Sequence, residues 1–188
     1  MEEYVREEEP TTVAPISNVA TFDVDDTPGE PDPEAAAPET LSTWRHGVVV
    51  GNIVFALKLW ARANPGWQIA TANPGVKLGG DLDSLRGPDV GAIRDDNRPT
   101  ERGPNGWLDG APDLVVEVAG DAHAPTELLG EALEYLDAGA RLVWIVDPIA
   151  EQVAVFSAGN VVELVRDGSV DASAVLPGFA CSLSDLFE

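Results

Sequence analysis

The chain has 188 residues, of which 44% are hydrophobic, so it is long enough for one globular domain with its own core. Its formal net charge of -22 argues against a large, permanent nucleic-acid-binding surface. The single cysteine, Cys181, excludes an internal disulfide and a zinc–cysteine cluster. Residues 1–20 lack the pattern of a signal peptide, and the most apolar stretch, 48–61, is too short to span a membrane. We therefore expect a cytoplasmic protein with no membrane partner.

Residues 1–40 differ in composition from the rest of the chain. Twelve acidic residues and one arginine give this segment half of the net charge, and prolines interrupt it throughout. Such a segment buries too little apolar surface to offset the entropy lost on ordering. We expect a disordered, acidic, proline-rich tail over residues 1–40 and one domain over residues 41–188.

Periodicity and turn residues predict the elements that precede residue 110. Apolar residues at helical spacing indicate a first helix, for which Ser42 or Thr43 is a suitable N-cap. Asn-Pro-Gly sequences mark the end of this helix and a later tight turn. The expected elements are a helix over 43–64, a hairpin of strands 67–71 and 76–78, a polar connection over 79–86, a strand over 87–93 that is opened by a proline, and a long charged loop over 94–109.

The stretch 111–148 has the pattern of a strand, a helix and a second strand. Valine-rich runs at 112–118 and 141–146 predict buried strands, and Gly139 is a suitable C′ residue for a helix over 126–138. A crossover of this length predicts that the two strands are parallel neighbours. The expected apolar stripe of the helix is Leu129, Ala132, Leu133 and Leu136, and the expected later elements are a hairpin of strands 152–156 and 161–165 and a short helix over 183–187.

Two acidic residues, Asp113 and Glu117, interrupt the valine-rich strand at 112–118. Strand side chains alternate between faces, so both carboxylates point to the same face. Burying an unpaired carboxylate is costly. We interpret Asp113, at the strand start, as a structural hydrogen-bond acceptor and Glu117, deep in the run, as functional. Asp89 opens another strand after Pro88, and together with Glu117 it could bind Mg²⁺ through carboxylate oxygens.

Several motifs occur in a fixed order along the chain. They are Gly87-Pro88-Asp89-Val90, the run from Ala111 to Val118, the run from Glu134 to Gly139, the run from Leu142 to Pro148, Leu176-Pro177-Gly178-Phe179 and an Asp-Leu-Phe sequence near the end. Together they resemble the Uma-two family of restriction endonucleases, and the resemblance spans roughly residues 43–188. It implies the fold of the PD-(D/E)xK nucleases, which is a restriction-endonuclease-like α/β (α+β) fold with a mixed β-sheet flanked by helices. It also implies metal-dependent hydrolysis of phosphodiester bonds.

The resemblance implies a catalytic site with Asp89 and Glu117 as metal ligands. The backbone carbonyl of Val118 would be a third ligand. His46, at the head of the first helix, matches a histidine that is often present there, although its position also suits an ordinary surface residue. On the same basis we expect Mg²⁺ or Mn²⁺ as the cofactor, DNA as the partner and a homodimer.

One departure from the family bears on activity. The superfamily lysine would follow Glu117 by two residues, or would lie on the next helix four residues before Tyr135. These positions hold Ala119 and Glu131. A lysine would orient the attacking water and stabilise the transition state, whereas a glutamate would not. Two hypotheses stay open: a metal-dependent endonuclease that Glu131 impairs, or a catalytically degenerate nuclease fold with a binding or regulatory role. A generic α/β domain whose acidic residues are only structural is disfavoured by the ordered motifs.

Overall fold

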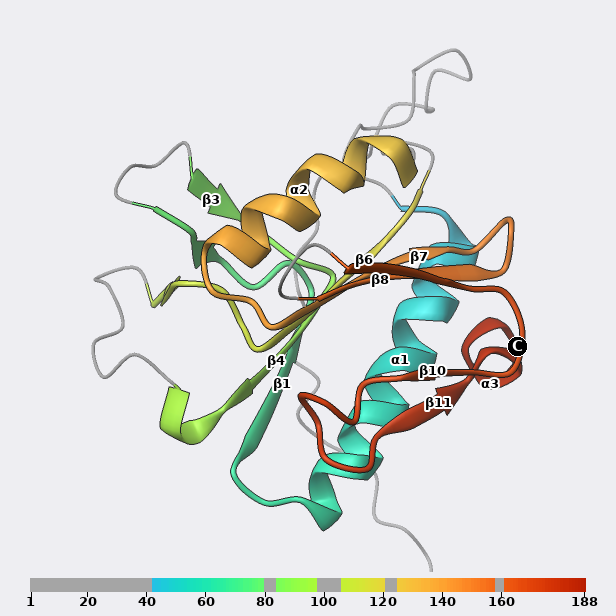
Figure 1. Cartoon of the computed structure of the whole chain (residues 1–188), viewed down its shortest axis with the longest axis horizontal. Helices are drawn as coiled ribbons and strands as arrows, with labels where there is room; N and C mark the ends of the chain where they lie inside the picture. The colour runs from blue at the N-terminus through green and yellow to red at the C-terminus, as the bar shows by residue number, and fades with distance from the viewer. Residues whose placement is uncertain (1–41, 80–83, 98–105, 121–124, 158–160) are drawn as a thin grey trace, which may run out of the picture. The chain divides into compact units, whose positions relative to one another are not determined.

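The computed structural model describes residues 42–79, 84–97, 106–120, 125–157 and 161–188. The chain divides into two units, Met1–Ala37 and Pro38–Glu188, and all the described residues belong to the second. The predicted disordered tail over residues 1–40 lies outside the described residues, and the domain boundary after residue 40 stays a prediction. Within the second unit, Figure 1 confirms the expected fold class, a mixed β-sheet with helices against it.

The elements of this unit are helices and mostly short strands. Their order is α1 (Trp44–Ala63), β1 (Trp67–Thr71), β2 (Val76–Lys77), β3 (Leu85–Arg86), β4 (Val90–Arg94), the 3-10 turn η2 (Asp95–Asn97), β5 (Leu108–Asp109), β6 (Leu114–Val118), α2 (Pro125–Asp137), β7 (Leu142–Asp147), β8 (Gln152–Ser157), β9 (Val161–Val165), β10 (Ser169–Asp171), β11 (Ala180–Ser182) and α3 (Leu183–Phe187).

Helix α1 confirms the first predicted helix. Thr43 is the N-cap: its backbone is extended, and its side-chain oxygen accepts a hydrogen bond from the backbone N–H of His46. Val49, Ile53 and Leu57 lie at helical spacing and are buried against the sheet. The cap and this buried stripe together fix the first turn of α1, and therefore the place of His46.

The main sheet has the strand order β1-β4-β6-β7-β8-β9. β6 and β7 are parallel, as the strand–helix–strand pattern predicts, and the other neighbouring pairs are antiparallel. Leu114, Val116 and Val118 pack into the core on the side of α1, whereas Val115 packs on the side of α2. Figure 1 shows α1 and α2 on opposite faces of this sheet. The predicted hairpin of β8 and β9 and the predicted helix α3 are both present.

The predicted hairpin of strands 67–71 and 76–78 is wrong. β1 pairs with β4, and β2 belongs to a separate three-stranded sheet, β3-β2-β5. Ala72 and Asn73 both adopt positive φ angles, 66° and 54°, which turn the chain away from β1. Val76 is then buried in the core cluster under α2, on the opposite side of the main sheet from Ile69 of β1.

Two regions that the sequence predicted as irregular connections contain short elements, including strands of the second sheet. The polar connection over 79–86 contains β3, and the charged loop over 94–109 contains η2 and β5. Both strands are two residues long, which is too short for a periodic pattern to reveal. The pair β10 and β11, three residues each, was missed for the same reason.

The buried face of α2 differs from the predicted stripe. Leu128, Ala132 and Tyr135 are buried, whereas Leu129 and Leu133 are 42% and 46% exposed. Consecutive residues in a helix are about 100° apart around its axis. The buried face is therefore shifted around this axis by about one residue from the predicted face. Because of this rotation, Tyr135 faces the sheet and can reach the strand that carries Glu117.

Candidate functional site

Asp89 and Glu117 lie next to each other at the ends of two neighbouring strands. β4 and β6 are antiparallel with Val90 opposite Val116, so Asp89, which precedes β4, is brought to Glu117. The backbone N–H of Asp89 donates a hydrogen bond of 3.4 Å to Oε2 of Glu117. The structure therefore brings together the two acidic residues that the sequence singled out.

Asp89 is held on two sides by α1 and β6. Its Oδ2 accepts a hydrogen bond of 2.8 Å from the backbone N–H of Val118 and lies 3.1 Å from Nε2 of His46. The side chains of His46 and Asp89 are 12% and 16% exposed. The hydrogen bond with Asp89, and then the negative charge of Asp89, raise the pKa of His46 above 6.5, against the opposing effect of burial. The structure thus places His46 beside Asp89.

Glu117 is buried, with 7% of its surface exposed. Tyr135, fully buried on α2, donates a hydrogen bond of 2.8 Å from its hydroxyl to Oε1 of Glu117. Burial raises the pKa of Glu117 to about 8, and the charges of Asp89 and Glu131 add to this rise, whereas its hydrogen bonds oppose it. At neutral pH Glu117 is therefore mostly protonated unless a cation approaches it.

Glu131 faces this site from α2. It is partly buried, and its charge raises the pKa of both Glu117 and Tyr135. It lies one helical turn before Tyr135, on the same side of the helix. Position 131, where the resemblance implies a lysine, thus holds a carboxylate whose negative charge acts on Glu117, the candidate metal ligand.

The donor set of the site suits a hard divalent cation. Asp89 and Glu117 offer carboxyl oxygens, and the negative charges of Asp89 and Glu131 both raise the pKa of Glu117, which favours a cation in place of its proton. Among the described residues, no group of three or more His, Cys, Asp or Glu side chains is arranged to hold a metal. Two carboxylates could hold a hard divalent cation whose other ligands come from water or substrate. Val118 ends β6 beside Glu117, and the contact that it makes with Asp89 is through its N–H.

Asp113 lies at the opposite end of β6 and has a structural role in the sheet. Its Oδ2 accepts a hydrogen bond of 2.9 Å from the backbone N–H of Arg94, and Oδ1 is 3.9 Å from Nη1 of Arg141. Its backbone carbonyl also accepts the N–H groups of Arg141 and Leu142. These contacts tie β4 and the start of β7 to β6, which supports the structural interpretation of Asp113.

Tyr135 is the site residue that sequence reasoning missed. In the sequence it served only as a landmark for the absent lysine. A signal was present, because Tyr135 lies at i+7 from Leu128 and i+3 from Ala132, which is the spacing of a buried helical face. A buried tyrosine hydroxyl needs a hydrogen-bond partner, and the strand beneath it carries Glu117.

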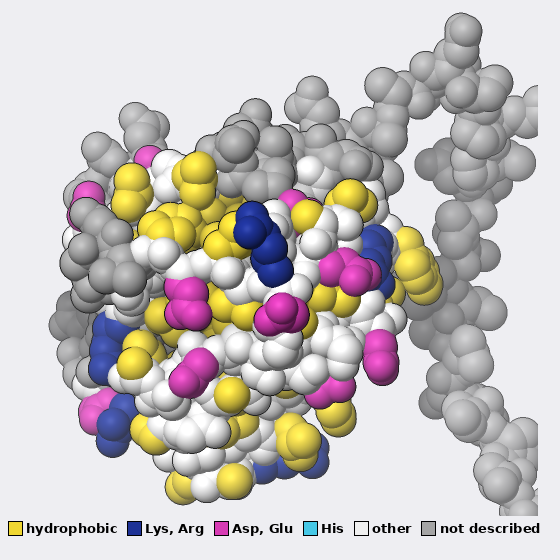
Figure 2. Space-filling view, turned by 45° about the vertical axis from the view of Figure 1, so that its right-hand side comes forward, with side chains coloured by type: hydrophobic (Ala, Val, Ile, Leu, Met, Phe, Trp, Pro, Cys, Tyr) yellow, Lys and Arg dark blue, Asp and Glu magenta, His cyan; other side chains and the backbone are white. Residues whose placement is uncertain are grey.

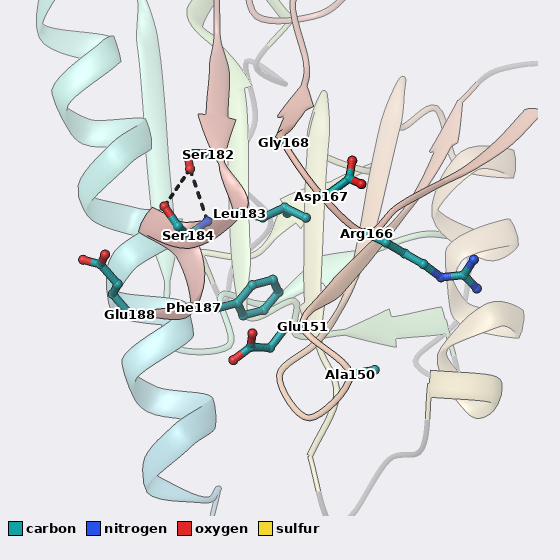
Figure 3. A pocket seen from close by; sticks show the side chains of 10 residues that line it. All are labelled: Ala150, Glu151, Arg166, Asp167, Gly168, Ser182, Leu183, Ser184, Phe187 and Glu188. Atoms are coloured by element: carbon teal, nitrogen blue, oxygen red, sulfur yellow. Dashed lines mark hydrogen bonds between the residues drawn. The ribbon is translucent and has the colours of Figure 1, made fainter.

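The described residues carry side chains of both charges on the surface. On the face drawn in Figure 2, acidic side chains are interspersed with basic and apolar ones. A hollow of about 710 Å³, drawn in Figure 3, carries three carboxylates and one guanidinium, and its Arg166 extends away from the other side chains. Its lining consists of Ala150, Glu151, Arg166, Asp167, Gly168, Ser182, Leu183, Ser184, Phe187 and Glu188, and so includes none of the candidate site residues.

Within the described part of the chain, no helix has the length and apolar character of a membrane span.

Comparisons with known proteins identify the family. A solved structure, described as "Crystal structure of a putative nuclease belonging to DUF820 from Anabaena variabilis ATCC 29413", matches with a TM-score of 0.66 and 19% sequence identity, over 78% of this chain and 82% of that chain. At this identity the likeness shows a shared fold. No curated protein matches the chain. Residues 37–184 match the model of the family Uma2, described as "Putative restriction endonuclease". Since this match covers most of the sequence, the chain belongs to the Uma2 family.

Proposed function

We propose that the protein is a metal-dependent endonuclease that hydrolyses phosphodiester bonds in DNA. The observation that carries this proposal is the pairing of Asp89 and Glu117 at adjacent strand ends. Glu117 is buried there, and its pKa is raised by burial and by the charges of Asp89 and Glu131. Membership of the Uma2 family supports a nuclease, and the similar structure from Anabaena variabilis is itself described as a "putative nuclease". Asp89 and Glu117 would hold Mg²⁺ or Mn²⁺, with the carbonyl of Val118 as a further ligand.

Each carboxylate has a partner that positions it. His46 and the N–H of Val118 hold Oδ2 of Asp89, and Tyr135 holds Oε1 of Glu117. A bound divalent cation would lower the pKa of a water molecule and neutralise negative charge on the phosphate. Protonated His46 would add a positive charge beside Asp89. These partners hold the two carboxyl groups in fixed positions.

DNA cleavage by the purified protein tests the proposal. Plasmid, linear duplex and single-stranded DNA are each incubated with Mg²⁺ or Mn²⁺. The wild-type protein should nick or cut DNA only with a metal, and Glu117→Gln and Asp89→Asn should abolish this. Glu163→Gln is the matched control, because Glu163 is exposed on β9, at the edge of the main sheet. Absence of cleavage with both metals and all three DNA forms would contradict the proposal.

A second candidate function is a catalytically degenerate nuclease fold that binds or regulates. The observation that favours it is Glu131, which places a negative charge where the resemblance implies a lysine. If this is correct, the wild-type protein should bind a divalent cation without cleaving DNA, and Glu131→Lys should gain metal-dependent cleavage. Robust cleavage by the wild-type protein would exclude it.

The proposal also includes a cytoplasmic setting and a homodimer. Cys181 is free and buried, which suits a reducing compartment. Sedimentation equilibrium should give twice the chain mass of 19.8 kDa for the protein alone, and two chains per duplex when a short DNA duplex is bound. A single species at the monomer mass under both conditions would contradict the dimer and leave the proposed chemistry unaffected.

A further inference from the structure

The outer face of α1 is apolar, although it points away from the core. Val49, Ile53 and Leu57 form the buried face of this helix. Opposite them around the helix axis lie Trp44 and Phe55, which are 90% and 70% exposed. A surface helix normally presents polar residues to solvent, and a helix that is apolar on all sides is normally covered on all sides. Within the described residues, only the first of these two faces is covered.

The exposed residues form a continuous line along the helix, which we call the α1 stripe. It consists of Trp44, Val48, Gly51, Phe55 and Leu59, which recur every three or four positions and therefore share one face. Leu59 is 56% exposed. A Cβ added at Gly51 would have no other atom within 4 Å, so the stripe is low and open in its middle. The stripe thus has a low centre between two raised aromatic side chains.

Charged side chains do not hinder an approach to the α1 stripe. The helix carries no Asp or Glu, although the chain has 33 acidic residues. From residue 47 to residue 57 it carries no charged residue at all. Arg45 is held by its ion pair with Glu151, and Lys58 and Arg62 lie near the C-terminal end. Two copies of a strongly acidic protein can therefore meet at this helix with little repulsion.

A hollow of about 380 Å³ opens beside the C-terminal half of the stripe. Phe55 and Leu59 line it from α1, and residues 178–182, which include β11, line it as well. Figure 1 shows β11 beside α1. Among the residues that line the hollow, only Asp185 is charged. Trp44 lies eleven residues before Phe55, or about 16 Å along the helix, so one face carries a protruding aromatic at one end and a hollow at the other.

We propose that the α1 stripe is the contact surface of a two-fold homodimer, in which Trp44 of each copy packs on Phe55 and into the hollow beside it in the other copy. A two-fold axis that crosses α1 between Val49 and Val50 lays the two helices antiparallel and makes both contacts at once. Gly51, close to this axis, lets the two backbones approach each other. The inference rests on the homodimer of the proposed function and on none of its chemistry.

The two helices offer enough area for a specific dimer. A buried aromatic side chain covers about 150–250 Å², so the exposed parts of two copies of Trp44 and Phe55 would bury on the order of 600 Å². Specific interfaces bury about 1,200–2,000 Å² in total. The aromatic contacts alone therefore supply about half of the lower value. The rest of two helices of about 30 Å, together with the walls of the two hollows, can supply the remainder.

Sedimentation equilibrium of the full chain at several concentrations tests the proposal. The wild-type protein should be a dimer. Phe55→Glu should raise the dissociation constant at least about 30-fold, because it removes a central aromatic contact from both copies and adds two negative charges. Leu133→Glu is the matched control, since Leu133 is 46% exposed on α2, against the opposite face of the main sheet. The same change of charge there should leave the dissociation constant within about threefold of wild type.

A second pair of variants tests the antiparallel arrangement. Trp44→Arg should weaken the dimer, as Phe55→Glu does. In the variant with both changes, the introduced arginine of one copy faces the introduced glutamate of the other, so this variant should dimerise more tightly than either single variant. The two positions are about 16 Å apart within one copy, so the recovery cannot arise inside a single chain. If circular dichroism shows that Phe55→Glu does not fold, Trp44→Arg takes its place in the comparison with Leu133→Glu, because Trp44 is 90% exposed.

The outcomes separate this proposal from the proposed function. A wild-type dimer that Phe55→Glu leaves intact would overturn α1 as the contact surface, and so would a double variant that dimerises no more tightly than the single ones. A wild-type monomer would overturn a second copy as the occupant of the α1 stripe, together with the proposed homodimer. The endonuclease is decided apart from all of these results, by metal-dependent cleavage of DNA by the wild-type protein.

Discussion

The hydroxyl of Tyr135 donates a hydrogen bond of 2.8 Å to Oε1 of Glu117, and this bond joins α2 to the middle of the main sheet. Both residues are buried, and each alters the other: the charge of Glu117 raises the pKa of Tyr135, and the bond from Tyr135 lowers that of Glu117. The bond is strongest when Glu117 is ionised, because charge-assisted hydrogen bonds are about twice as strong as neutral ones.

Replacing Tyr135 by phenylalanine should therefore destabilise the protein in a pH-dependent way. The variant loses the bond and leaves a buried carboxylate without its partner on α2. The free energy of unfolding should fall by about 2 kcal/mol at pH 9, where Glu117 is ionised, and by less at pH 5, where it is protonated. Urea unfolding at the two pH values measures this difference. An equal loss at both values would show that the bond does not sense the charge of Glu117.

The core of the fold was predictable because its signals are local. The valine runs at β6 and β7 and the spacing between them predicted two buried parallel strands. The face of α2 was not predictable in the same way, because Leu128 and Leu129 both belong to plausible stripes. A tertiary contact selects the face with Leu128, Ala132 and Tyr135. Glu117 on β6 needs a hydrogen-bond partner, and Tyr135 provides it.

The pairing of β1 shows a second limit. Asn73-Pro74-Gly75 is a typical turn sequence, so the sequence favoured a hairpin with Val76. The buried partner of β1 is β4, which lies about twenty residues further along the chain. Likewise, the contact of Asp89 with Glu117 depends on an antiparallel register between β4 and β6 that no local pattern reports. The residue types and the family resemblance both suggested that these two residues act together, and the register gives the physical reason.

Replacing Glu117 by glutamine should change how stability depends on pH. The pKa of Glu117 is about 8 in the folded protein against an ordinary value of 4.5, so between these values the folded state holds a proton that the unfolded state releases. Stability contributed by this proton is present at low pH and is lost as pH rises through 8. The full effect is on the order of a few kcal/mol. Glu117→Gln should flatten this decline and be the more stable protein at pH 9, as measured by urea unfolding between pH 5 and pH 9. A steeper decline in the variant would contradict the raised pKa.

Binding of a divalent cation should release a proton from Glu117. At pH 7 a group with a pKa of about 8 is mostly protonated, and a metal ligand must be ionised. Titration with Mn²⁺ in buffers of different ionisation enthalpy should show about 0.9 proton released at pH 7 and little at pH 9.5. Asp89→Asn should bind weakly, and Glu163→Gln should behave as the wild type. Binding at pH 7 without proton release would mean that Glu117 is not a ligand.

Removing the charge of Asp89 should lower the pKa of His46. The hydrogen bond and the negative charge of Asp89 raise this pKa, and burial alone would lower it. In Asp89→Asn, the NMR titration of the imidazole should therefore move to lower pH, past the ordinary value of 6.5. His46→Gln identifies the signal, since the chain has two histidines. An unchanged titration would show that His46 is not paired with Asp89 in solution.

Replacing Glu131 by lysine should ionise Glu117 at neutral pH. The charge of Glu131 raises the pKa of Glu117, and a positive charge at the same helix position acts in the opposite direction. In Glu131→Lys the pKa of Glu117 should fall below 8, so Mn²⁺ binding at pH 7 should release less of a proton. Glu163→Lys makes the same change of charge on the exposed edge strand β9 and should leave both quantities unchanged. If the two variants behave alike, the net charge of the protein sets the pKa of Glu117, and the acid at position 131 has no specific effect on it.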